Sequence, residues 1–174
     1  MSEVYLKKAK KTPETGTSET RKIVERMLSE IEIGKETIAK KYASDLDGFN
    51  GDIIVSQESI ENASKMVPEK LKDDIKFAHE RIKKFAEAQK QSISEFETEL
   101  SPGLWAGQKL IPIQTAGCYV PGGRYAHVAS AIMSITTARV AGVENIIACS
   151  APKCEDGPNP AILYTMNYCG ADKK

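Results

Sequence analysis

The sequence predicts an α/β fold, an N-terminal helical segment followed by an incomplete parallel βαβα unit. Three observations support this prediction. Apolar residues recur at helical spacing through much of the first half of the chain, and two short apolar runs in the second half have the character of strands. Each of those runs is followed by a glycine- and proline-containing loop and then by a helical pattern. The order strand, helix, strand, helix builds a parallel sheet.

Composition limits the kind of protein that this chain can be. Of its 174 residues 41% are hydrophobic, which is enough for a core, and 24 basic residues balance 24 acidic ones. Without net charge or a tract of one sign, binding to nucleic acid or to an anionic membrane is disfavoured. The lysines near the N-terminus precede no apolar run and no segment reaches membrane-spanning length, so we expect a cytoplasmic protein.

The chain is predicted to have three parts. Residues 1–17 mix Lys, Thr, Pro and Gly without periodicity and are expected to form an N-terminal arm. Residues 18–115 are expected to be the helix-rich part of a first α/β domain. Residues 116–174 are expected to be a second, truncated α/β domain.

The elements before residue 68 are short. Residues 18–31 carry an amphipathic stripe that predicts a helix, Gly34 interrupts it, and a second helix is expected over about 35–44. The segment Asp52–Val55 is β-prone and bounded by turn residues, which predicts a short strand. Ser56 is placed to cap a following helix.

The longest predicted element is a helix over about 68–97, opened by Pro68 and ended by Ser101-Pro102-Gly103. Such a helix would be about 45 Å long, more than a domain of this size covers. Its stripe is explained by core packing, and its excess length suggests a partner surface as the alternative. His79 lies one step off the stripe and is interpreted as a solvated flanking residue. The stripe is formed by Leu71, Ile75, Ala78, Ile82, Phe85, Gln89, Ile93 and Phe96.

The second half of the chain is organised around the segment Gly117–Arg124. Residues 103–114 before it alternate loosely, and Pro112 confines them to an edge or a bend. After it a helix rich in small residues runs from about His127 to Gly142. The continuous apolar run Asn145–Cys149 is typical of a parallel strand buried on both faces. A loop over 150–159 and a helix begun by Pro160 and closed by Gly170 follow.

Two loops follow the two predicted strands, over 121–127 and 150–158. Ligands of open α/β sheets bind outside the carboxyl ends of the strands, so both loops should lie on one side. The paired glycines Gly122 and Gly123 lack Cβ atoms, and the next helix offers N–H donors, which suits an anion or a nucleotide phosphate. The alternative is that this Pro-Gly-Gly turn only reverses the chain. Neither standard nucleotide-binding glycine motif is present.

The sequence indicates a functional role for few side chains. Arg124 suits an anionic group, with a solvated side chain as the alternative. His127 could touch a ligand, with helix capping or solvation as the alternative. The cysteines Cys118, Cys149, Cys154 and Cys169 are interpreted as reduced packing residues. The sequence shows no Ser/His/Asp set, no pair of carboxylates at a spacing typical of acid–base catalysis, and no His/Cys/Asp cluster that could bind a metal. A third parallel strand should follow the last helix, so we expect an incomplete module, cut from a longer protein or completed by another chain.

Six segments together resemble those of a known protein family, namely Ala116–Gly123, Ala138–Val143, Cys149–Ser150, Asn159–Leu163, Cys169–Gly170 and Phe77–Gln89. By these segments the sequence resembles the histidinol dehydrogenase family over nearly its whole length. Three further segments are similar to the branch of that family that oxidises the sulfonated diol 2,3-dihydroxypropane-1-sulfonate. These segments are Lys10–Gly16, Leu100–Leu104 and Gly122–His127.

The resemblance implies an NAD- and zinc-dependent dehydrogenase with a Rossmann-like fold, working as an intertwined homodimer. It would oxidise a primary alcohol, L-histidinol or the sulfonated diol, through a bound aldehyde to a carboxylate. By the same match Tyr119 corresponds to an NAD-contacting tyrosine, and Pro121, Gly122 and Gly123 form the adjoining turn. The family's catalytic glutamate–histidine pair and zinc ligands come later in its chain. We therefore expect no catalytic or metal-binding residue in residues 1–174, and no activity from them alone. The alternative is a non-catalytic interaction module completed by a partner chain.

Overall fold

The computed structural model describes residues 18–122, 125–153 and 157–174, so the predicted N-terminal arm lies outside the described residues. The chain divides into two compact units, of which the first ends at Tyr42 and the second spans Ala43–Lys174. Each unit is described by itself. The domain boundary predicted after residue 115 stays a prediction.

Helix α1 (Ser18–Asp47) contains the two helices that the sequence predicts near the N-terminus. They join at Lys35, whose φ of 51° and ψ of −136° are not helical, directly after Gly34, the residue expected to interrupt the pattern. Within the first unit the Tyr42 hydroxyl donates to the Glu30 carboxylate at 2.6 Å, across this kink. None of the residues of α1 is buried.

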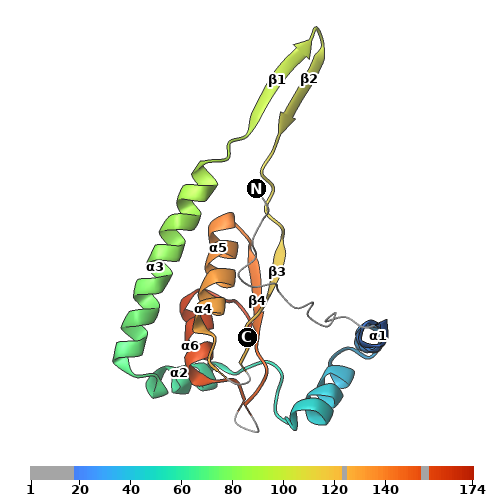
Figure 1. Cartoon of the computed structure of the whole chain (residues 1–174), viewed down its shortest axis with the longest axis vertical. Coiled ribbons are helices and arrows are strands. Elements are labelled where there is room, and N and C mark those ends of the chain that lie inside the picture. The colour runs from blue at the N-terminus through green and yellow to red at the C-terminus, as the bar shows by residue number, and fades with distance from the viewer. Residues whose placement is uncertain (1–17, 123–124, 154–156) are drawn as a thin grey trace, which may run out of the picture. The chain divides into compact units, whose positions relative to one another are not determined.

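The second unit contains all the other elements, and Figure 1 shows their arrangement. Its first half comprises α2 (Gln57–Met66), α3 (Glu69–Gln91) and the antiparallel strands β1 (Phe96–Ser101) and β2 (Leu104–Gln108). Its second half comprises β3 (Thr115–Tyr119), α4 (Val128–Ala131), the π-helical η1 (Ile132–Thr136), α5 (Thr137–Ala141), β4 (Asn145–Cys149) and α6 (Pro160–Tyr168).

Strands β3 and β4 form a parallel sheet, as the α/β prediction requires. They pair from Thr115 opposite Asn145 to Tyr119 opposite Cys149. At the other edge of β4 the last residues of the chain begin to pair, because Lys173 forms a parallel bridge with Ile147. The backbone N–H of Ala148 donates to the carbonyl oxygen of Lys173 at 2.8 Å. This bridge lies where the sequence predicts the next parallel strand.

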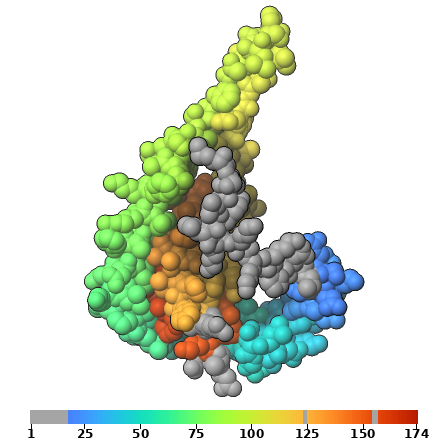
Figure 2. All heavy atoms as spheres, viewed as in Figure 1, coloured from blue at the N-terminus to red at the C-terminus, as the bar shows by residue number. Residues whose placement is uncertain are grey.

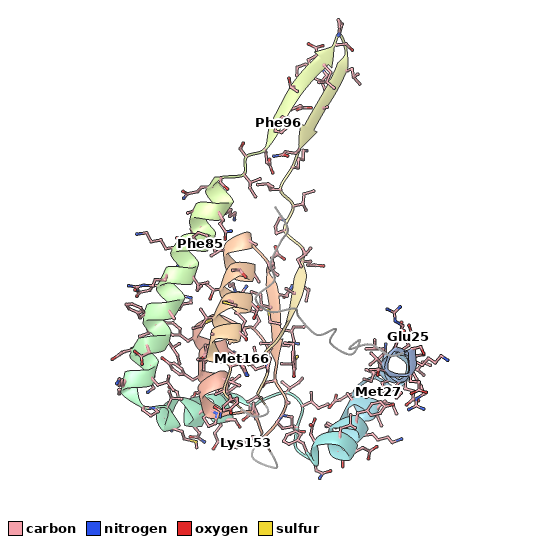
Figure 3. All side chains as sticks on the ribbon, viewed as in Figure 1. Glu25, Met27, Phe85, Phe96, Lys153 and Met166 are labelled. Atoms are coloured by element: carbon pink, nitrogen blue, oxygen red, sulfur yellow. The ribbon has the colours of Figure 1, made fainter. Side chains whose placement is uncertain are left out.

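The core lies on one face of this sheet. Ile146 and Ala148 on β4 are buried there against α3, the helical segment 128–141 and α6. Figure 3 shows Met166 of α6 pointing into this core. Ile147, on the opposite face, is 45% exposed. The prediction of a strand buried on both faces was wrong, because among the described residues of this unit the helices pack on one side of the sheet (Figure 1).

The predicted helix ends are confirmed at several positions. Ser56 caps α2, since its Oγ accepts a hydrogen bond from the N–H of Ser59 at 3.1 Å. Pro160 begins α6 as predicted. Asn159 before it, for which the sequence analysis made no prediction, caps the helix by accepting from the N–H of Ala161 at 2.9 Å. Gly142 follows α5 with a φ of 95°, a left-handed conformation that glycine adopts without steric cost.

Two predictions for the first half of the second unit were wrong. The long helix ends at Gln91, and the residues expected to extend it to about 97 lead into β1. The Ser101-Pro102-Gly103 run, interpreted as a helix end, is instead the turn of the β1–β2 hairpin, with Gly103 at a φ of 82°. The segment Asp52–Val55 is not a strand, because it consists of bends and irregular backbone. The N–H of Val55 at its end donates to the carbonyl oxygen of Lys174 at 2.9 Å.

Candidate functional site

The loops that follow β3 and β4 meet at one end of the parallel sheet, as predicted. The N–H of Val120 donates to the carbonyl oxygen of Cys149 at 2.8 Å, which extends the sheet pairing to the end of β3. Two residues later Gly122 lies directly against Ser150 and Ala151 of the second loop. The carboxyl ends of both strands therefore open on the same side, where ligands of parallel sheets bind.

Gly122 is buried, and its contacts explain why the position lacks a side chain. A Cβ atom built there would overlap the Oγ of Ser150 and lie 3.2 Å from the carbonyl oxygen of Ala151 and 3.3 Å from Cδ1 of Ile162. The glycine thus permits close approach between the two loops and the start of α6. Gly122 therefore has a packing role whether or not a ligand binds there.

Of the predicted cofactor residues that the structure describes, Tyr119 has the most exposed side chain. It is the last residue of β3, and it is 64% exposed on the face of the sheet opposite the packed helices of this unit. A tyrosine in this position can stack on a planar ring or offer its hydroxyl as a hydrogen-bond donor. Pro121 beside it is half-buried, whereas Gly123 and Arg124 lie outside the described residues.

The start of the next helix supplies fewer donors than the sequence suggests. The N–H of Val128 donates to the carbonyl oxygen of Ala126 at 2.9 Å, and that of Ser130 to His127 at 3.0 Å. His127 itself is exposed at the N-cap of α4 and makes no side-chain capping bond. The turn therefore pairs two of the backbone N–H groups at the start of the helix. The side chain of His127 does not cap the helix.

The cysteines do not form a reactive centre among the described residues. Burial raises the pKa of the Cys169 thiol to about 11. Partial desolvation and then the neighbouring Cys118 raise the pKa of Cys149. Both thiols are therefore protonated at neutral pH and are poor nucleophiles. Cys118 is buried as expected, Cys149 is exposed on the open face, and Cys154 lies outside the described residues.

His79 is packed rather than solvated, which corrects the sequence interpretation. Its ring meets Tyr168 of α6 edge-on, with centroids 5.1 Å apart, and its buried Nδ1 has no hydrogen-bond partner. Desolvation, and then the charge of Lys83, lower its pKa. The ring is therefore held in its neutral form between α3 and α6.

The described ranges contain no group of three or more His, Cys, Asp or Glu side chains that could hold a metal ion. The described residues therefore do not fit a zinc ion, and no chemical step is assigned to one. Within the same ranges, no helix is long and apolar enough to cross a membrane.

An arginine network that the sequence analysis missed fixes the opposite end of the sheet. Arg139 of α5 donates to the carbonyl oxygens of Gly170 and Glu144 and pairs with the carboxylate of Asp172. The same carboxylate accepts the N–H of Ile146 at 2.7 Å. The N–H of Ile146, followed by Arg139, lowers the pKa of Asp172. A lone arginine in a run of small residues is the only sequence signal of this network.

The family model described as histidinol dehydrogenase matches residues 10–173. The chain belongs to the histidinol dehydrogenase family. The crystal structure of histidinol dehydrogenase from Elizabethkingia anophelis superposes with a TM-score of 0.82 at 30% identity, over 91% of this chain and 36% of that one.

Two curated relatives are more similar in sequence. A histidinol dehydrogenase homolog of Pelagibacter ubique is 54% identical over 99% of this chain. The sulfopropanediol 3-dehydrogenase of Ruegeria pomeroyi is 51% identical over 97% of it. The chain spans 40% and 39% of the length of these two relatives.

Proposed function

We propose that this chain forms the nucleotide-contacting part of an NAD-dependent dehydrogenase, with Tyr119 in contact with the cofactor. The observation that carries the proposal is the exposed Tyr119 at the carboxyl end of β3, beside the packed Gly122–Ser150 contact. Parallel α/β sheets bind their ligands at this end. Membership of the histidinol dehydrogenase family supports the choice of a dehydrogenase.

In this proposal the residues of this chain bind and orient, and NAD supplies the hydride acceptor. The phenol ring of Tyr119 provides an aromatic surface for a planar part of the cofactor, and its hydroxyl provides a hydrogen bond. The Pro121–Gly122 turn, held against Ser150, fixes the backbone from which Tyr119 projects. Gly123 completes the proposed cofactor-binding set.

The whole protein is proposed to oxidise a primary alcohol through an aldehyde to a carboxylate, with zinc bound by residues outside this chain. The sulfonated diol is the first substrate to test, because a relative with 51% identity is named a sulfopropanediol 3-dehydrogenase. L-Histidinol is the second. Arg124 and His127 are proposed to contact the substrate, and a cytoplasmic location belongs to the same proposal.

Cofactor binding can be measured on the 174-residue chain by isothermal titration with millimolar NAD. We expect Tyr119→Ala to weaken binding about tenfold, which corresponds to ~1.4 kcal/mol. Tyr119→Phe should retain the stacking contribution, so its affinity for NAD should lie between those of the wild type and Tyr119→Ala. Phe77→Ala is the matched control, since Phe77 is an aromatic residue that is 57% exposed on α3.

Two outcomes would contradict the proposal. One is an NAD affinity that Tyr119→Ala and Phe77→Ala reduce equally, and the other is no NAD binding by the wild-type chain. Turnover is a separate assay. The purified chain, mixed with NAD and either alcohol, is expected to produce no NADH, and NADH production would show that the catalytic groups lie within these residues.

A further inference from the structure

The loop between α1 and α2 contains an asparagine followed by a glycine, Asn50-Gly51. Both residues are exposed and lie outside any helix or strand. Figure 2 shows the cyan part of the chain, which includes this loop, at the surface of the protein. Among the residues that the structure describes, the backbone N–H of Gly51 donates to no acceptor. The nitrogen of Gly51 is therefore available to react with a neighbouring group.

The side chain of Asn50 is the electrophile closest to that nitrogen along the chain, and asparagine is a thermolabile residue. Attack of the Gly51 nitrogen on Cγ of Asn50 forms a carbon–nitrogen bond and closes a succinimide ring, while the bond from Cγ to Nδ2 breaks. The side-chain nitrogen leaves as ammonia and takes the proton of the Gly51 N–H. Water then opens the ring at either carbonyl carbon, which yields aspartate or isoaspartate. No oxidant or reductant is needed.

Glycine at position 51 favours this attack and is also required by the packing of the loop. A residue without a Cβ atom does not hinder the approach of its nitrogen and reaches more backbone conformations. A Cβ atom built on Gly51 would lie 2.6 Å from Cζ of the Phe49 ring. Any larger residue would therefore have to displace this ring, so the contact with Phe49 explains why the reactive pair ends in glycine.

The other asparagines of the chain lack an available nitrogen on their C-terminal side. Asn62 and Asn167 lie inside α2 and α6, where the next N–H belongs to the helical hydrogen-bond ladder. The N–H of the residue after Asn145 donates to the carboxylate of Asp172 at 2.7 Å. Asn159 precedes a proline, which has no N–H. Succinimide formation at Asn62, Asn145 and Asn167 requires local unfolding first.

A similar pair at the start of the same loop is protected by the end of α1. Asp47-Gly48 could close the same ring with loss of water in place of ammonia. The N–H of Gly48, however, donates to the carbonyl oxygen of Ser44 at 3.1 Å, and Asp47 is the last residue of the helix. This pair is therefore a matched reference, because it differs from Asn50-Gly51 in the hydrogen bond of the glycine nitrogen.

We propose that Asn50-Gly51 is a site of deamidation in the folded protein. The reaction places a carboxylate in residues 45–52, which already contain three aspartates and no basic residue. It also removes the donor of the hydrogen bond from Nδ2 of Asn50 to the carbonyl oxygen of Gly48, which is 3.5 Å long. Like charges repel one another, so the modified loop packs less firmly at the end of α1. The modification does not depend on the proposed cofactor site.

The test follows single residues of the 174-residue chain by peptide mass spectrometry at neutral pH, in buffer and in guanidinium chloride. Asn50 is expected to convert in the folded chain within about threefold of its rate in the unfolded chain, because no hydrogen bond has to break. Asn62 should convert at least about tenfold more slowly when folded, which is ~1.4 kcal/mol of added barrier. Isomerisation of Asp47, read from peptide retention, should be slowed to a similar extent.

Asn50→Gln is the control variant, because its longer side chain would have to close a larger and less favourable ring. In isoelectric focusing the wild-type chain should gain an acidic band with time, Asn50→Asp should start at that band, and Asn50→Gln should not form it. An Asn50 amide that persists in the folded chain but is lost in guanidinium chloride would overturn the proposal. An acidic band that forms as fast in Asn50→Gln would overturn it as well.

Discussion

Replacement of Gly122 by alanine tests the close contact on which the candidate site is built. The backbone of Gly122 is not in the left-handed region, so alanine introduces no conformational strain and would by itself stabilise the chain by about 0.4–1 kcal/mol. The added Cβ, however, overlaps Ser150 Oγ and lies within 3.3 Å of Ile162 Cδ1. Overpacking of this kind costs about 1–3 kcal/mol. We expect a net loss of ~1–2 kcal/mol in the free energy of unfolding.

The contact with Ser150 can be separated from the others by a double-mutant cycle. Among the residues that the structure describes, the Ser150 hydroxyl makes one hydrogen bond, a long one of 3.5 Å to the carbonyl oxygen of Ala151, so Ser150→Ala alone should cost less than ~0.5 kcal/mol. Combined with Gly122→Ala it removes the overlapping oxygen and should recover ~1 kcal/mol. Urea unfolding followed by circular dichroism gives all four values. A Gly122→Ala variant as stable as the wild type, or a cycle without coupling, would refute the packing between the two loops.

Further predictions concern the rest of the second unit. Arg139→Lys should cost ~2 kcal/mol in urea unfolding because it loses the forked contacts to Gly170 and Asp172, and an unchanged midpoint would contradict this. The free energy of unfolding should fall as pH decreases through about 6.5, because the folded-state pKa of His79 lies below its unfolded value. His79→Leu should reduce this dependence of stability on pH, measured in unfolding curves from about pH 8 to about pH 5. Ile146→Ala should cost ~3 kcal/mol and Ile147→Ala less than ~1 kcal/mol, and equal losses would show that both faces of β4 are covered.

Local signals in the sequence predict much of the second unit correctly. Ser56 and Pro160 mark helix starts because each satisfies or removes an N–H that the first turn cannot pair, and Gly142 marks an end because it adopts a positive φ. The run Asn145–Cys149 is short, apolar and β-branched, and it forms a strand with those bounds. These features depend on residues that are close in the sequence, so the local sequence pattern is enough to predict them.

Features that depend on distant residues were not predicted. Phe96 continues the helical spacing of α3 by coincidence, and its pairing with Gln108 places it in a strand. The sequence also cannot show that Ile147 lies on the face opposite the described helices that pack on the sheet, since that depends on the side on which each connection crosses the sheet. The packing reason for Gly122 involves Ser150 and Ile162, which are far from it in the chain.

The central claim, that the Tyr119 end of the parallel sheet contacts NAD, is tested most directly by a residue-resolved titration. Amide ¹H–¹⁵N spectra of the 174-residue chain would be recorded with increasing NAD. We predict that the shifts concentrate in residues 119–122 and 150–153 and that Tyr119→Ala diminishes them. Shifts centred instead on α3 and α5, or none at millimolar NAD, would contradict the account.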